Sequence, residues 1–84
     1  MSEKNYLATI ELDHEGGLGK VYAEKTGDGY RVSVELPDGT IEYGEGGIDP
    51  TEGDCIESID IAWGPEGGDT WNLQWTDYAK ELMP

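Results

Sequence analysis

CIESIDIAWGPEGGDTWNLQW, residues 55–75, is the stretch on which the predicted fold depends. It holds all three tryptophans of a chain that has no phenylalanine. Apolar residues alternate with polar or small ones in both arms of this stretch, at Ile59, Ile61 and Trp63 and again at Trp71, Leu73 and Trp75. That period of two is typical of half-buried strands, and the glycines and proline at 64–68 predict a reversal between them. We therefore expect a hairpin here that buries more area per residue than any other segment.

Alternating patterns before this hairpin predict four further strands, at residues 6–12, 20–25, 30–36 and 40–43. The turn residues at 27–29 (GDG) and 37–39 (PDG) connect the last three of these strands into a meander. With the two arms of the hairpin, the chain would form about six short strands.

The remaining segments predict little helix. Asp49 can cap a single helical turn that begins with Pro50 and ends at Gly53. Ile56 and Glu57 are out of phase with the alternation that follows, which predicts a bulge near Glu57 or a strand that starts after residue 55. At the end of the chain, residues 77–83 (DYAKELM) predict a short helix capped by Thr76 or Asp77.

These elements predict a mainly β fold, in one small acidic domain over residues 1–84. We expect a small antiparallel sheet, or a partly open barrel, of about six short strands with a short C-terminal helical turn. A chain of 84 residues buries only about 60–65% of the surface that its unfolded form exposes. The core must therefore be thin, and the aromatic residues should supply much of it.

The charge of the chain restricts its partners. Nineteen acidic residues against five basic ones give a formal net charge of −14. Such a charge repels nucleic acid and anionic membranes, so we expect no direct nucleic-acid binding and no membrane binding. No lysine or arginine occurs between Arg31 and Lys80, which makes the second half of the chain a source of negative potential. A basic protein is the expected partner.

The densest run of acids gives the candidate partner-binding residues, Glu42, Glu45, Asp49, Glu52, Asp54, Glu57 and Asp60. Carboxylates on a rigid small domain can replace the phosphates of DNA on a basic, nucleic-acid-binding surface, with the same release of counterions. The hypothesis is a non-catalytic inhibitor that blocks such a surface.

In size, charge and hairpin content the chain resembles small phage-encoded inhibitors of bacterial defence systems, including DNA-mimicking anti-CRISPR and anti-restriction proteins. This resemblance is one of composition. Because Cys55 is the single cysteine, no internal disulfide can form, and we expect a cytoplasmic location, in the host cell if the protein is phage-encoded. Two other readings of the acidity stay open: a halophile-type surface, or a solubilised β domain with a structural or assembly role. An unpaired edge strand could also recruit a second copy into a homodimer.

Other kinds of site fit the residues less well, and we expect no catalytic residue, metal or cofactor. The acids at 49–57 do not have the spacing of a calcium-binding loop, although weak cation binding is an alternative. His14 has no second histidine or cysteine ligand nearby for zinc. Acidic surroundings would raise the pKa of the Cys55 thiol, so we expect a small buried hydrophobe and no nucleophile. The three tryptophans suggest one more alternative, a weak sugar-binding platform.

Overall fold

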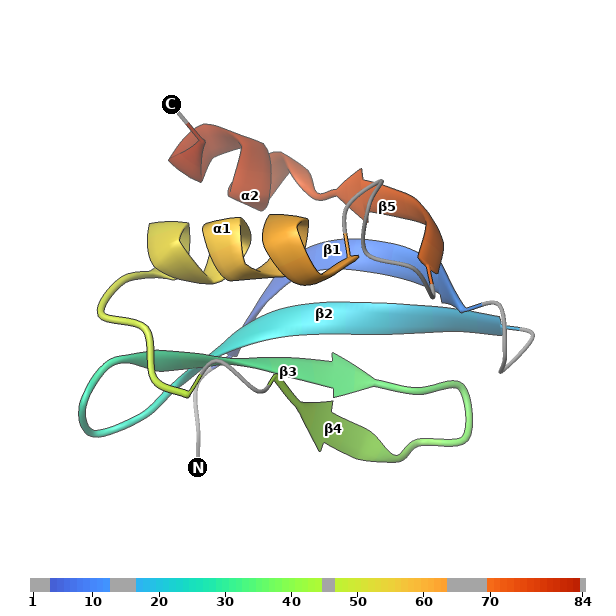
Figure 1. Cartoon of the computed structure of the whole chain (residues 1–84), viewed down its shortest axis with the longest axis horizontal. Helices are drawn as coiled ribbons and strands as arrows, with labels where there is room; N and C mark the ends of the chain where they lie inside the picture. The colour runs from blue at the N-terminus through green and yellow to red at the C-terminus, as the bar shows by residue number, and fades with distance from the viewer. Residues whose placement is uncertain (1–3, 13–16, 45–46, 64–69, 84) are drawn as a thin grey trace.

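The computed structural model describes residues 4–12, 17–44, 47–63 and 70–83, with residues 12, 62, 63 and 70–72 described by their backbone only. It is mainly β, as predicted: five antiparallel strands form one open sheet, joined by one short helix and one C-terminal helical turn (Figure 1). The elements in chain order are β1 (Lys4–Leu12), β2 (Gly17–Lys25), β3 (Tyr30–Glu35), β4 (Ile41–Tyr43), α1 (Glu52–Trp63), β5 (Thr70–Trp75) and α2 (Asp77–Leu82).

The strands lie in the order β4-β3-β2-β1-β5, so β4 and β5 are the two edges. The predicted meander is confirmed, because β2, β3 and β4 pair in sequence through tight turns. β5 does not pair with the segment before it. It pairs instead with β1, placing Trp75 opposite Ala8 and Leu73 opposite Ile10. The β5 edge of the open sheet is therefore formed by pairing between the first strand of the chain and the last.

The core lies between one face of the sheet and α1 and α2 (Figure 1). The sheet contributes Leu7, Ala8, Ile10, Val21, Ala23, Val32 and Val34, and the helices contribute Cys55, Ile56, Ile59 and Ala79. A register shift in β1 between Tyr6 and Ala8 turns both Leu7 and Ala8 into the core, at 0% exposure each. Tyr6 is left on the opposite face, where its ring lies 5.6 Å from that of Tyr22.

The predicted strand at the start of residues 55–75 is wrong, because this segment belongs to α1. Its apolar residues fit both periods: Ile59, Ile61 and Trp63 alternate, whereas Cys55, Ile56 and Ile59 follow one face of a helix. The helix buries Cys55, Ile56 and Ile59 and leaves Ile61 81% exposed, so Ile59 and Ile61 do not share a buried face. The phase break at Ile56 and Glu57 results from the helix, and no bulge is needed to explain it.

The start of α1 also differs from the prediction. The cap is Thr51 and not Asp49: the Thr51 Oγ1 accepts a hydrogen bond from the Asp54 N–H at 3.1 Å and donates one to the Asp54 carboxylate at 3.0 Å. Gly53 lies inside the first turn and does not end the helix. At the other end of the chain, the prediction that Thr76 caps α2 is confirmed, with the Ala79 N–H donating to its Oγ1.

Among the described residues, no helix covers the second face of the sheet. The strand register places most of the basic residues of the chain there, on strands β1 to β3: Lys4, Lys20 and Arg31. Arg31 donates to Glu24 at 2.8 Å and stacks on the Tyr43 ring at 3.8 Å, while Lys4 lies over Tyr22. Arg31 is thus paired with an acid and an aromatic ring on this face, and Lys4 with an aromatic ring.

Candidate functional site

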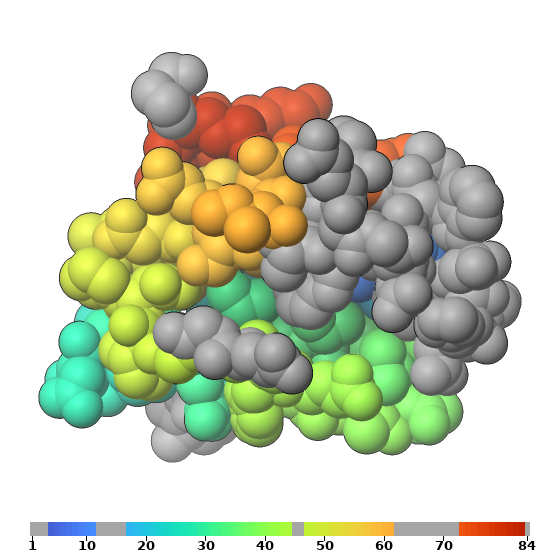
Figure 2. Space-filling view, viewed as in Figure 1, coloured from blue at the N-terminus to red at the C-terminus, as the bar shows by residue number. Residues whose placement is uncertain are grey.

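The outer side of α1 is the candidate partner-binding site. Helical geometry turns the chain by ~100° per residue, so Asp54, Glu57 and Asp60, spaced by three, form a stripe along the helix. Glu57 faces away from Cys55, Ile56 and Ile59, which are buried against the sheet, whereas Asp60 lies one turn from Ile56 at the edge of the buried face. In Figure 2, α1 forms part of the molecular surface on the side shown. The basic residues described above do not reach this side, because they lie on the opposite face of the sheet.

Glu52 belongs to the same run of acids, but its carboxylate forms hydrogen bonds within the fold. Its carboxylate accepts hydrogen bonds from the Tyr78 hydroxyl at 2.8 and 2.9 Å and from the Asn5 side-chain amide at 2.9 Å. These contacts join α1 to α2 and to β1. The hydrogen bond to the Glu52 carboxylate raises the pKa of Tyr78 to about 12, because it stabilises the protonated phenol.

Asp49 also forms hydrogen bonds within the fold, through its backbone and its side chain. Its backbone makes a two-way bridge with Tyr30, with N–O distances of 2.8 and 2.6 Å. Gly29 makes this approach feasible: its φ is +155°, and a Cβ there would lie 2.4 Å from the Asp49 carbonyl oxygen. The Asp49 carboxylate accepts from the Ser58 hydroxyl at 3.3 Å. Asp49 therefore holds the chain in place just before α1 begins.

Cys55 lies in the core, as expected for a small buried hydrophobe. Burial, and then the negative charge of Asp49, raise the pKa of its thiol to about 12. At neutral pH the sulfur is a thiol with no exposed surface. His14, the single histidine of the chain, lies outside the described residues.

Glu57 and Asp60 are the two remaining acids of α1. Both are exposed, and neither forms a hydrogen bond or ion pair with another residue in the described ranges. Ile61 lies beside them, with 81% of its surface exposed. An exposed apolar side chain thus follows two exposed carboxylates on a helix that has no basic residue in its last turn.

The other two candidates lie elsewhere. Glu42 is exposed on β4 and pairs across the strands with Val34, so it lies on the helical side of the sheet but on a different element. Glu45 lies outside the described residues. The structure therefore gathers five of the seven predicted residues in the segment formed by Asp49 and α1, and three of those five (Asp49, Glu52 and Asp54) are engaged in internal hydrogen bonds.

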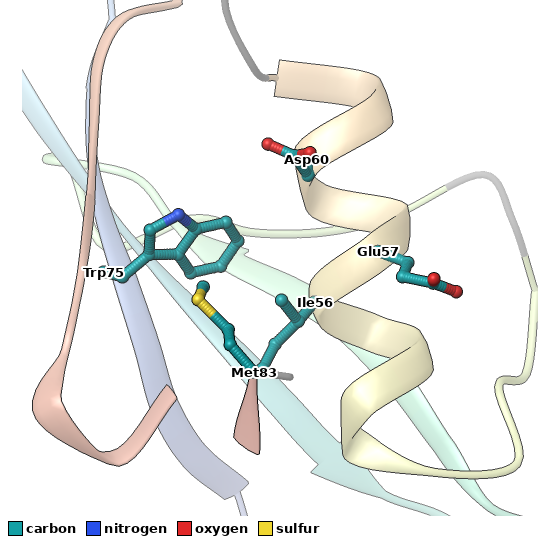
Figure 3. A pocket seen from close by; sticks show the side chains of 5 residues that line it. All are labelled: Ile56, Glu57, Asp60, Trp75 and Met83. Atoms are coloured by element: carbon teal, nitrogen blue, oxygen red, sulfur yellow. The ribbon is translucent and has the colours of Figure 1, made fainter. Parts of the chain in front are cut away.

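Sequence reasoning missed a pocket beside this surface. The pocket has a volume of about 270 Å³ and lies between α1, β5 and the residue after α2. Its lining residues are Ile56, Glu57, Asp60, Trp75 and Met83 (Figure 3). A helical reading of residues 55–63 would have placed Ile56 and Asp60 one turn apart on the same side, which is the signal that could have found it.

The structure also bears on the alternative sites. Trp63 ends α1 and Trp71 lies in β5, so the hairpin that would have made one platform of three tryptophans does not exist. Trp75 is half-buried and packs against the core. In the described part of the chain, no three His, Cys, Asp or Glu side chains are placed to hold a metal ion.

No helix among the described residues is long and apolar enough to cross a membrane. Comparisons of the chain with protein-family models, with curated proteins and with solved structures found no match.

Proposed function

We propose that this chain is a non-catalytic acidic binding protein whose α1 outer surface docks on a basic, nucleic-acid-binding surface of another protein, in the manner of a phage-type DNA mimic. The observation that carries the proposal is the pair Glu57 and Asp60, two exposed carboxylates without a described partner on a helix that is firmly held to the sheet. Because α1 is fixed at its start by Asp49, Glu52 and Asp54, these carboxylates are presented with little freedom to lose on binding.

Ile61 adds a reason for contact between surfaces. Interfaces draw much of their free energy from apolar anchors that neighbouring contacts shield from water. A partner that covers Ile61 would exclude water from around Glu57 as well, and a cationic group opposite would then interact more strongly than it does in bulk solvent. An exposed Ile61 next to Glu57 is therefore more favourable against a basic surface with an apolar recess than in contact with water.

The experiment compares two variants of equal charge. In the first, Glu57→Lys is combined with Asp60→Lys. In the second, Asp28→Lys is combined with Glu81→Lys; both of these acids are exposed and lie outside the outer side of α1. Each tagged protein is used to capture binding partners from bacterial lysate over a salt series, with and without DNA as competitor, after circular dichroism has verified the fold.

We expect the wild-type protein to retain a nucleic-acid-binding protein that DNA displaces and that salt releases. The Glu57/Asp60 variant should lose this protein, and the Asp28/Glu81 variant should keep it. Equal loss in both variants would attribute binding to net charge alone, and equal retention would remove α1 from the interface. Either result overturns the proposal.

The alternative of a halophile-type or solubilised domain makes a different prediction. A halophile-type surface needs salt to screen its own repulsion, so such a protein unfolds at low salt. We expect this chain to remain folded in dilute buffer, by circular dichroism at about 10 mM salt, where the Debye length is about 30 Å. A homodimer through edge strand β4 or β5 is a separate proposal, and sedimentation at several protein concentrations tests it.

A further inference from the structure

The pocket between α1 and β5 has walls of two kinds. Ile56, Trp75 and Met83 form an apolar side, with the Trp75 indole directed from β5 toward α1 and the Met83 thioether next to it (Figure 3). Asp60 contributes a carboxylate on the indole side of α1, and Glu57 lies on the outer side of the helix (Figure 3). One end of the pocket is thus apolar and the other is anionic.

We infer that this pocket takes one lysine or arginine side chain of the partner protein, an inference that rests on the proposed function and assigns it a specific contact. Among natural side chains, only these two combine a long apolar stem with a permanent positive charge. The stem would lie against Ile56 and Met83, and the charged end would reach the Asp60 carboxylate. The Trp75 indole would add a cation–π contact, for which tryptophan is the best of the aromatic residues.

Other occupants fit less well. An apolar side chain would take the Asp60 carboxylate out of water without giving it a partner, which opposes binding. An acidic side chain would meet Asp60 and Glu57 as like charges. A short polar side chain would leave the apolar wall of Ile56, Trp75 and Met83 uncovered. Charge complementarity therefore selects a cation, and the apolar wall of Ile56, Trp75 and Met83 selects one with a long apolar stem.

The pocket walls are held before any partner arrives. Ile56 is 6% exposed and belongs to the core. Trp75 is placed by its register with Ala8, and the next residue donates its N–H to the Leu7 carbonyl at 2.9 Å. The Met83 N–H donates to the Lys80 carbonyl at 3.3 Å, which holds the end of α2. A preformed pocket loses less entropy on binding than one that must assemble.

The test is an NMR titration of the full chain with three capped tripeptides, N-acetyl-Gly-X-Gly-amide, in which X is lysine, arginine or norleucine. Norleucine has the stem of lysine and lacks the charge. We follow the Trp75 indole N–H and the Met83 methyl group, assigned by Trp75→Phe and Met83→Leu. The affinity of a single side chain is expected to be weak, with Kd on the order of 1–10 mM. We expect saturable shifts at both groups with lysine or arginine, and at least tenfold weaker binding of norleucine.

Two variants assign the charge contact. Asp60→Asn should weaken binding of the lysine or arginine peptide roughly three- to tenfold and leave norleucine unchanged. Asp28→Asn, an exposed acid on the β2–β3 turn, removes the same charge at a distance and should change neither. Equal binding of norleucine, equal effects of the two variants, or no shift at Trp75 and Met83 would each overturn the inference.

The result is separable from that of the capture experiment. If the peptides fail to bind but the Glu57/Asp60 variant loses its partner, α1 docks through its outer surface and the pocket stays empty. If the lysine or arginine peptide binds in the pocket but DNA displaces no partner, the inference about the pocket is supported and the proposed DNA-mimic function is overturned.

Discussion

Removal of the Glu52 carboxylate should loosen α1 and α2 together. We predict that Glu52→Ala lowers the free energy of unfolding by about 2 kcal/mol, while Glu57→Ala, the same deletion five residues later in the same helix, changes it by less than about 0.5 kcal/mol. The difference follows from the contacts. Glu52 accepts from Tyr78 and Asn5, whereas Glu57 is exposed with no partner among the described residues.

The magnitude follows from two donors and one helix end. A hydrogen bond to a charged group contributes about 1.5–3 kcal/mol when it is well shielded. Tyr78 is 39% exposed, so water can replace part of each bond, and we count about 1 kcal/mol for each donor. Loss of an acid from the first turn costs roughly 0.5 kcal/mol more, and relief of repulsion in a chain of charge −14 offsets about as much.

Urea denaturation followed by circular dichroism measures both variants against the wild-type protein. For a domain of this size, about 2 kcal/mol corresponds to a fall of roughly 8–16 °C in Tm. A second readout is the ionisation of Tyr78, followed by the NMR signals of its ring. Its pKa should fall from about 12 toward 10 in Glu52→Ala and stay near 12 in Glu57→Ala. Equal stability of the two variants, together with an unchanged Tyr78 titration, would refute the reasoning.

Two further predictions concern buried groups. The Ser33 hydroxyl is 1% exposed and has no hydrogen-bond partner among the described residues, so Ser33→Ala should leave stability unchanged or raise it by about 1 kcal/mol in the same urea assay; a loss above about 1 kcal/mol would show that the hydroxyl is bonded. The pKa of Cys55 is raised from 9.0 to about 12, so the folded state holds this proton more tightly than the unfolded state does. The resulting stability is fully present below pH 9 and is lost as pH rises toward 12, with a slope of up to about 1.4 kcal/mol per pH unit; Cys55→Ala should remove that part of the slope, and identical slopes in the two proteins would contradict the prediction.

The strands could be predicted because each has a single pattern. β3 alternates without interruption, and the turns on either side carry residues that suit a reversal, so both its position and its pairing follow from local sequence. β5 was located on the same basis, but its partner was not. Local reasoning paired it with the preceding segment, whereas it pairs with β1 from the other end of the chain.

The first half of residues 55–75 could not be predicted because it fits two periods. The capping residues favoured a helix, with Thr51 three residues before Asp54, and the strand pattern of Ile59, Ile61 and Trp63 concealed it. The bulge at Leu7 had no signal in the sequence, since Tyr6 and Leu7 are both suited to a core face. The pocket is lined by α1 and by β5, so it could not have been found without knowing that residues 52–63 form a helix.

The placement of the acids bears on whether their charge serves solubility or binding. A solubilising carboxylate acts at any position on the surface, whereas charges gathered on one side increase self-repulsion without a gain in solubility. Here three of the five bases lie on the far face of the sheet, where Arg31 pairs with Glu24, so the outer side of α1 keeps its negative charge. Glu52 contributes to stability through Tyr78, whereas Glu57 and Asp60 form no such bond with the described residues. Under the proposed function, binding to a basic partner gives these two carboxylates a physical reason for their position.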